Sequence, residues 1–373
     1  MLFVSVLPLV VFLAPAFPQF SFLSSLGLSS FIAPKSVAER NAGGQAELNK
    51  MRARIETAKH LLEREAPQTT DFVTVAVADA ATSETHLLKL SKDAFLDKDA
   101  ETVATASSGK TFKLRAVRPN YVNTAVRVTD AAGREFQPLV VQYPVERGGA
   151  LKEVAYYAAA HPALRSPELV GGGRAYVHRM LNEAAARLAQ QGKMISPEIV
   201  DAAERLCIVE HTDHKRFKTE DHASLYNEIF TLYALNAGDT YRFSVSSAGA
   251  GGMVQMIPQT YQAIRQMHPT VGLNPDFVAG MRDHSNALEA MLLYMQGTWD
   301  DLLKHEEVRQ ALAENVATQT ELLAAGYNSN PARLHLYLER GGTYWRTLIP
   351  AETQMYLRIY ASVDGLVEFK TRS

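Results

Sequence analysis

The stretch SVSSAGAGGMVQMIPQT, residues 244–260, places three glycines directly before large apolar side chains. Gly249, Gly251 and Gly252 can adopt backbone conformations that other residues rarely adopt, and they allow another molecule to approach the backbone closely. The apolar residues that follow are Met253, Val254, Met256 and Ile257. Because a folded core buries such side chains, the pattern predicts an open turn anchored to a hydrophobic core.

Helical periodicity surrounds this stretch, from residue 149 to the C-terminus. Apolar residues recur three and four positions apart, which is typical of helices with one buried face. The segments with this period are 151–161, 173–192, 196–211, 285–305, 306–326 and 350–363. Gly192 is suited to end one helix, and Ser196 followed by Pro197 is typical of the start of the next. We expect residues 149–373 to form an all-α domain.

One of these helices leads to a carboxylate on its apolar side. The apolar stripe consists of Ile199, Ala203 and Leu206, and the same spacing continues to Glu210. Burial disfavours the charged form of a carboxyl and raises its pKa toward the range of a proton donor at neutral pH. The alternative is that Glu210 turns to solvent or pairs with Arg205 or Lys215.

The glycine-rich stretch resembles the signature of the lytic transglycosylases with a soluble-lysozyme-like domain. That signature reads Ser, two residues, Gly-Ala, one residue, Gly, two apolar residues, Gln, two residues, Pro, one residue, Thr. The matching positions are Ser246, Gly249, Ala250, Gly252, Met253, Val254, Gln255, Pro258 and Thr260. The resemblance implies a lysozyme-like helical domain in which Ser246, Gly249, Met253 and Gln255 bind the sugar chain.

Two further segments resemble motifs of the same family, and in total the resemblance covers roughly residues 175–365. AAGYNSNP, residues 324–331, is similar to the family's Ala-Tyr-Asn-Ala-Gly-Pro segment, with Tyr327 and Asn328 in matching places. Asn330 replaces a glycine, and asparagine tolerates a left-handed backbone better than most residues. PAETQMYL, residues 350–357, is similar to the family's closing Glu-Thr and tyrosine, through Glu352, Thr353 and Tyr356.

The resemblance implies cleavage of the β-1,4 bond between N-acetylmuramic acid and N-acetylglucosamine in peptidoglycan, without a cofactor. Glu210 would protonate the glycosidic oxygen and then take the proton of the muramic acid 6-hydroxyl, which gives a 1,6-anhydro sugar. Tyr327 would hold the Glu210 carboxyl, and Asn328 would fix the loop. Hydrolysing glycosidases generally use two carboxylates, and residues 246–260 contain none. This favours the intramolecular route.

The chain departs from the family pattern at two places, and these leave alternatives open. His211 stands where the family has a serine, and a long segment separates Glu210 from Ser246. Glu228, in another apolar helical run, is therefore a competing candidate for the acid. A hydrolysing muramidase, or a non-catalytic wall-binding protein of a secretion apparatus or phage particle, is the alternative function.

A cluster of potential metal ligands follows the candidate acid. It consists of Glu210, His211, Asp213, His214, Asp221 and His222. Because no standard zinc spacing fits, we expect a polar loop and no metal site. Cys207 lies four residues before His211 and could form a thiolate pair with it, but a buried structural cysteine is the simpler interpretation.

Residues 71–148 have a different period. Short runs rich in β-branched and aromatic side chains indicate strands, at 72–80, 85–92, 111–118, 124–130 and 136–145. The segment DAAG at 130–133 is typical of a hairpin turn. Because no helical run separates these strands, they predict a small antiparallel sandwich-like or barrel-like module. No catalytic cluster lies in it, and it could serve as a spacer or dock a protein partner.

The first 34 residues contain no charged side chain. They predict an export signal or a membrane anchor, although three prolines weaken a simple spanning helix. Residues 35–70 are expected to form an amphipathic helix and linker. We therefore expect an exported protein of the periplasm or cell envelope, with membrane association through residues 1–34 left open.

The composition of the chain limits the number of folded units and the kinds of partner that we expect. A chain of 373 residues is long enough for two folded units. The formal net charge is −2, whereas nucleic-acid binding calls for a strongly basic face, so we expect no nucleic-acid partner. The single cysteine, Cys207, excludes an internal disulfide. The sequence thus predicts a multidomain protein, with a small β-sandwich-like module followed by an all-α domain.

Overall fold

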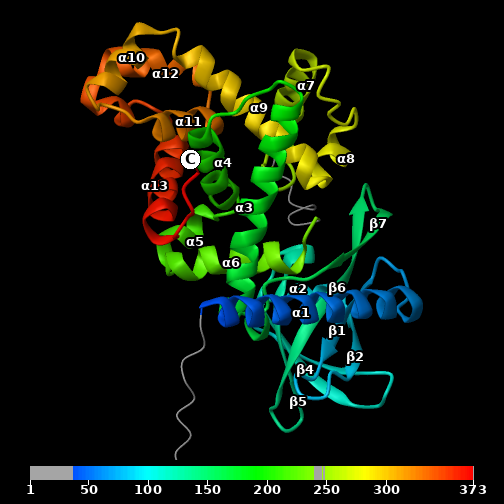
Figure 1. The fold of residues 1–373 in the computed structure, drawn as a ribbon. Helices are drawn as coiled ribbons and strands as arrows, with labels where there is room; N and C mark the ends of the chain where they lie inside the picture. Colours follow the sequence, from blue (N-terminus) through cyan, green and yellow to red (C-terminus); the bar gives the residue numbers. More distant parts are fainter. Residues whose placement is uncertain (1–36, 239–245, 247, 373) are drawn as a thin grey trace, which may run out of the picture.

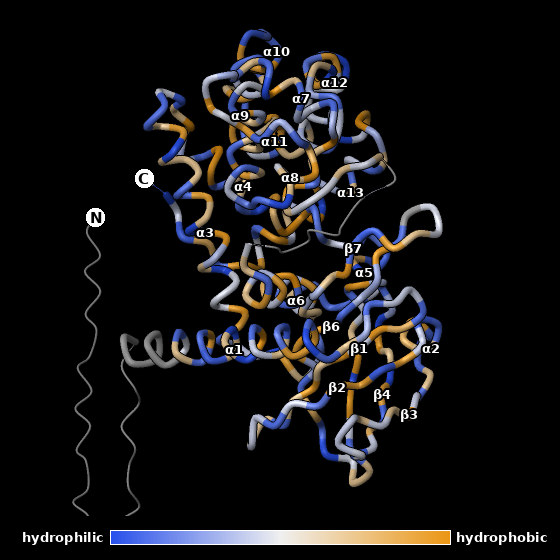
Figure 2. Tube along the Cα trace, turned by 90° about the vertical axis from the view of Figure 1, so that its right-hand side faces the viewer, coloured by the Kyte–Doolittle hydropathy of each residue, from blue (hydrophilic) through white to orange (hydrophobic). Residues whose placement is uncertain are grey.

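The computed structural model describes residues 37–238, 246 and 248–372 (Figure 1). The predicted signal or anchor, residues 1–34, lies outside the described residues. Within the described part of the chain, no helix has both the length and the apolar character needed to cross a membrane. The fold combines an antiparallel sheet with a larger group of helices, and helix α1, Val37–Glu65, lies between the two (Figures 1 and 2).

The sheet has seven strands in the order β2-β1-β6-β5-β4-β3, and β7 pairs with β6. The strands are β1 (Phe72–Ala78), β2 (Thr85–Ser91), β3 (Glu101–Thr105), β4 (Thr111–Arg118), β5 (Ala125–Asp130), β6 (Glu135–Arg147) and β7 (Ala150–Tyr157). The expected antiparallel β module is confirmed, and of its two expected forms the barrel-like one is closer, because the long strand β6 pairs with β5 near one end and with β1 and β7 beyond it, so that all strands belong to one sheet. The two ends of the sheet approach each other, since β2 contacts β3.

The turns of the sheet explain part of its register. Gly133 has φ +81°, and its N–H donates to the carbonyl of Asp130 at 3.0 Å, as expected for a hairpin turn. Gly148 and Gly149 have φ +62° and +75°, which suits the tight connection between β6 and β7. Residues 151–157 therefore continue the sheet, and the predicted helix at 151–161 is wrong. Valine and tyrosine side chains in this segment favour a strand, and the sheet extends to residue 157 instead of 148.

From residue 162 onward the regular structure described is helical. The helices are α3 (Pro167–Gln190), α4 (Pro197–Val209), α5 (His214–Thr219), α6 (His222–Leu235), α7 (Pro258–Met267), α8 (Phe277–Arg282), α9 (His284–Leu302), α10 (Glu306–Ala313), α11 (Gln319–Asn328), α12 (Leu334–Gly341) and α13 (Ala351–Leu366). A short helix, α2 (Lys92–Leu96), lies in the sheet module, and 3₁₀ turns occur at η1 (Tyr121–Asn123), η2 (Pro162–Leu164), η3 (Pro331–Arg333) and η4 (Gly342–Thr347). The predicted single helix at 306–326 is two helices, because Asn315 has φ +56° and Thr318 starts α11 with a capping box.

Helix α1 is an integral part of the core, where only an amphipathic helix and linker were expected. Its buried side chains include Leu48, Met51, Ile55 and Leu62, and they pack in one cluster with residues of β1, β6 and α3. Glycines in α3 permit the close contacts on this side. A Cβ on Gly172 would lie 2.7 Å from the Leu48 side chain, and a Cβ on Gly173 would lie 1.8 Å from the carbonyl oxygen of Phe230 in α6.

Helix α4 is fixed at its start and along its length. Ser196 is the N-cap and accepts a hydrogen bond from the N–H of Ile199, and Pro197 is the first helical residue, as predicted. Arg372, close to the C-terminus, lies 2.6 Å from Asp201 and 2.5 Å from the buried Glu204. The helix that leads to Glu210 is thereby held by Arg372.

Candidate active site

Glu210 is the C-cap residue of α4, where the apolar face of the helix ends. Its Oε1 accepts a hydrogen bond of 2.5 Å from the hydroxyl of Tyr356 in α13. Burial raises the pKa of Glu210 to about 8, and the Tyr356 hydrogen bond opposes the shift only in part. Glu352 adds to the shift through its negative charge. A carboxyl with this pKa is largely protonated at neutral pH, as a general acid requires.

His211 links the end of α4 to the glycine-rich turn. Its Nε2–H donates to the carbonyl of Met253 at 2.9 Å. Burial lowers the pKa of His211 to about 3, so the imidazole is neutral at physiological pH and this hydrogen bond orients the ring. His211 thus supplies a side chain long enough to anchor the turn.

The turn itself has the conformations that its glycines permit. Gly249 and Gly252 have φ +77° and +71°. A Cβ on Gly252 would lie 2.5 Å from the carbonyl oxygen of Met281, so a larger residue cannot fit without movement. The N–H of Gly251 donates to the carbonyl of Met256 at 3.2 Å and closes the turn.

The apolar residues after the glycines are buried, as the sequence predicted. Met253 and Val254 are fully buried, and Met256 is 3% exposed. The expectation that Met253 binds sugar is therefore wrong for its side chain, which packs in the main core. What Met253 contributes is its carbonyl, which is the acceptor for His211.

Tyr327, at the end of α11, has a different hydrogen-bond partner from the one expected. Its hydroxyl donates to the carbonyl of Val254 at 2.6 Å, whereas the tyrosine that donates to Glu210 is Tyr356. Burial raises the pKa of Tyr327, and the charge of Glu210 raises it further. Tyr327 therefore lies near enough to the acid to sense its charge. Tyr327 therefore orients the turn, and Tyr356 holds the carboxyl.

The remaining predicted sugar-binding residues lie on or beside the turn. Ser246 is exposed, and its Oγ accepts from the N–H of Ala250 at 3.1 Å. Gln255 is half-buried with φ +48°, and its Nε2 donates to the carbonyl of Gly252 at 2.9 Å. Asn328 is half-buried at the last position of α11. Asn330 has φ −80° and caps η3, so it does not use the left-handed conformation that asparagine tolerates.

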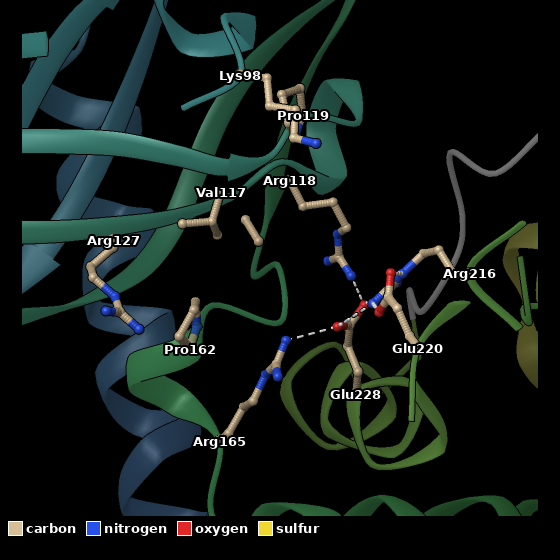
Figure 3. Close-up of a pocket in the computed structure, with 11 residues that line it drawn as sticks. Lys98, Val117, Arg118, Pro119, Arg127, Pro162, Arg165, Arg216, Glu220 and Glu228 are labelled. Carbon is tan, nitrogen blue, oxygen red and sulfur yellow. Dashed lines mark hydrogen bonds and ion pairs between the residues drawn. The ribbon is translucent and has the colours of Figure 1, made fainter. Parts of the chain in front are cut away.

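Glu228, the competing candidate for the acid, is engaged in ion pairs. It is 4% exposed and contacts the guanidinium groups of three arginines. These are Arg118 of β4, Arg165 before α3, and Arg216 of α5 (Figure 3). A carboxyl surrounded by cations favours its ionised form, which is unsuited to donating a proton. The geometry therefore favours Glu210 as the acid.

The potential metal ligands after Glu210 serve as helix caps and hydrogen-bond partners. Asp213 is the N-cap of α5, and Asp221 is the N-cap of α6. His222 bonds to the carbonyl of Phe217 at 2.8 Å and to the hydroxyl of Ser362. Over residues 37–372, apart from 239–245 and 247, no group of three potential ligands is arranged to hold a metal ion. Cys207 is fully buried, and burial raises its pKa.

The geometry brings together one carboxyl whose pKa is raised by burial, the tyrosine that holds it and a glycine-rich turn fixed to the end of the same helix. Comparisons of the chain with protein-family models, with curated protein sequences and with solved structures found no match. Tyr356 is the member of this candidate site whose contact with Glu210 the sequence did not predict. Its place in the PAETQMYL segment was the signal that could have identified it.

Proposed function

We propose that this protein is a peptidoglycan lytic transglycosylase with a lysozyme-like helical domain, acting in the periplasm or cell envelope. The observation that carries the proposal is the position of the Glu210 carboxyl beside the glycine-rich turn. Burial raises the pKa of this carboxyl to about 8, and His211 ties the turn to the end of the same helix. The sequence motifs at the turn and around Tyr327 support the same substrate.

The proposed reaction uses Glu210 twice. The protonated carboxyl gives its proton to the glycosidic oxygen as the bond from C1 of muramic acid breaks. The resulting carboxylate then takes the proton of the 6-hydroxyl while the oxygen at C6 bonds to C1. No water is consumed, and Glu210 is again protonated at the end. The hydrogen bond from Tyr356 strengthens when Glu210 is ionised, so it stabilises the intermediate stage.

Hydrolysis by a muramidase is the second candidate. Glu352 lies near enough for its charge to raise the pKa of Glu210, and two carboxyl groups with separated pKa values are the usual equipment of a hydrolysing glycosidase. Glu352 is exposed at the start of α13, where a water molecule can reach it.

Digestion of purified peptidoglycan followed by mass analysis distinguishes these possibilities. We expect anhydro-muropeptides from the wild type and none from Glu210→Gln. The matched control is Glu352→Gln, which should still release anhydro products. Reducing-end products that disappear in Glu352→Gln would assign hydrolysis instead. Equal cleavage by the wild type and by Glu210→Gln would exclude Glu210 as the acid. Binding of peptidoglycan by a wild type that does not cleave it would support the non-catalytic wall-binding alternative.

A further inference from the structure

A hollow lies where the sheet module meets the helices, around the Glu228 ion pairs (Figure 3). Its volume is about 510 Å³. The charged residues that line it are Lys98, Arg118, Arg127, Arg165, Arg216, Glu220 and Glu228. They come from the sheet module, from the segment before α3, and from α5 and α6. Neither module could form this pocket alone.

The pocket carries an excess of positive charge. Five basic side chains face two carboxylates, a difference of three charges. Arg118, Arg165 and Arg216 share Glu228, and Arg216 also pairs with Glu220 at 2.8 Å. Burial and then the neighbouring charge of Arg216 lower the pKa of Arg165. Repulsion between cations therefore persists despite the ion pairs, and an added anion would relieve it.

The two remaining basic side chains of the pocket, Arg127 and Lys98, lie where an anion can reach them. Arg127 contacts Glu135 at 3.4 Å in an exposed pair, and Lys98 is exposed. Figure 3 shows both side chains on the sheet-module side, away from the point where the three arginines meet Glu228. The walls also include apolar surface from Val117, Pro119 and Pro162. A ligand that combines carboxylates with aliphatic groups fits this lining.

A neighbouring hollow of about 330 Å³ adjoins this pocket. The two hollows share Arg118, Pro119, Arg216 and Glu228. The second is also lined by His211, which follows Glu210 directly in the chain. On its other side lies Asn123 of η1, whose buried Oδ1 has no hydrogen-bond partner within the described residues. The basic pocket thus adjoins a hollow lined by the histidine that bonds to the Met253 carbonyl of the glycine-rich turn.

We propose that this junction pocket binds the carboxylates of the acidic peptide stem that muramic acid carries in peptidoglycan. The inference rests on the proposed function for the presence of such a substrate. The sheet module then takes part in substrate selection, with arginine guanidinium groups pairing with the peptide carboxylates. Glycan strands that carry peptides would be preferred to bare strands.

The test uses the two cations that do not contact Glu228. The pocket variant is Lys98→Glu with Arg127→Glu, and the matched control is Lys50→Glu with Lys152→Glu, which makes the same change of charge at exposed positions of α1 and β7. We expect the pocket variant to lower the ratio of cleavage rates on peptide-bearing and peptide-free strands by about tenfold, and the control to keep the wild-type ratio. An unchanged ratio in the pocket variant would overturn the proposal.

A binding measurement separates this inference from the proposed activity. Calorimetry with a released acidic stem peptide is carried out on Glu210→Gln, alone and combined with each charge variant. We expect binding that is lost in the pocket variant, kept in the control, and weakened when the peptide carboxylates are amidated. Equal binding of the amidated peptide, or of inorganic phosphate in its place, would overturn peptide recognition. Peptide binding by a wild type that cleaves no glycan would refute only the proposed function.

Discussion

The hydroxyl of Tyr356 lies 2.5 Å from Oε1 of Glu210, although 146 residues separate the two in the chain. Helix α13 therefore supplies the hydrogen bond to the carboxyl at the end of α4. The bond favours the ionised form and partly offsets the effect of burial on the pKa of Glu210. The acid is consequently held in place without being kept permanently ionised.

Replacing Tyr356 should change the pH dependence of cleavage. Tyr356→Phe removes the hydrogen bond, so the pKa of Glu210 should rise above about 8. Because the protonated acid starts the reaction, the decline of activity at alkaline pH should move to higher pH. The rate at the optimum should fall about tenfold because the carboxyl is less well oriented. A pH profile of peptidoglycan cleavage measures both effects.

Tyr360→Phe is the control for this prediction. Tyr360 lies one turn further along α13 and is also buried, and its replacement leaves the bond between Tyr356 and Glu210 in place. Its pH profile should match that of the wild type. If Tyr356→Phe also gives a wild-type profile, the bond does not act on the reacting group.

The raised pKa of Glu210 also predicts an effect on stability. The pKa is about 8 in the folded protein, compared with an ordinary value of 4.5. Between these values the folded state keeps a proton that the unfolded chain has released, so the free energy of unfolding falls as the pH rises from 4.5 to 8. Glu210→Gln has no titrating carboxyl at this position, so its free energy of unfolding lacks this decrease.

Thermal unfolding of the two proteins at several pH values measures this effect. The variant should be more stable than the wild type at pH 8, and the difference should shrink toward pH 4.5. A difference that stays constant with pH would mean that the carboxyl has an ordinary pKa.

The glycine-rich turn should tolerate no side chain at position 252. Gly252→Ala introduces a Cβ at 2.5 Å from the Met281 carbonyl, at φ +71°. We expect a loss of stability clearly above the roughly 1–2 kcal/mol that a left-handed conformation costs an ordinary residue. Gly272→Ala is the matched control, because φ there is +76° and no atom lies within 4 Å of the added group. Urea unfolding should separate the two, and equal losses would exclude the steric contact as the cause.

Glu228 should prove to be a structural residue. Glu228→Gln leaves Arg118, Arg165 and Arg216 without the shared carboxylate. Removal of one partner from a buried ion-pair cluster typically costs about 3–5 kcal/mol, so the melting temperature should drop by several degrees. Anhydro products should still form below that temperature. Complete loss of cleavage in a folded Glu228→Gln protein would instead make Glu228 the acid.

The sequence predicted local structure well where one short-range signal dominates. The cap at Ser196, the hairpin turn at Gly133 and the buried residues Met253 and Val254 were all predicted. Each depends on neighbouring residues only. The course of residues 151–157 was not predicted, because this segment has apolar residues at both spacings and its strand pairing with β6 is a long-range contact.

The candidate site was predicted in its parts but not in its contacts. Glu210 was expected on a buried face from its helical spacing, and burial does raise its pKa. The choice between Tyr327 and Tyr356 as its partner depends on how α11 and α13 pack against α4, which spacing along the chain does not encode. The ion pairs of Glu228 were missed for the same reason, since Arg118 comes from the sheet module and Arg216 from α5.

The bond between Arg372 and Glu204 shows how strongly α4 depends on distant segments. Glu204 is buried in α4, and its contact with Arg372 joins residues 168 positions apart. The contact of Glu210 with Tyr356 joins residues 146 positions apart. A fragment of this chain that stops before α13 would therefore contain the acid but lack the tyrosine that holds it.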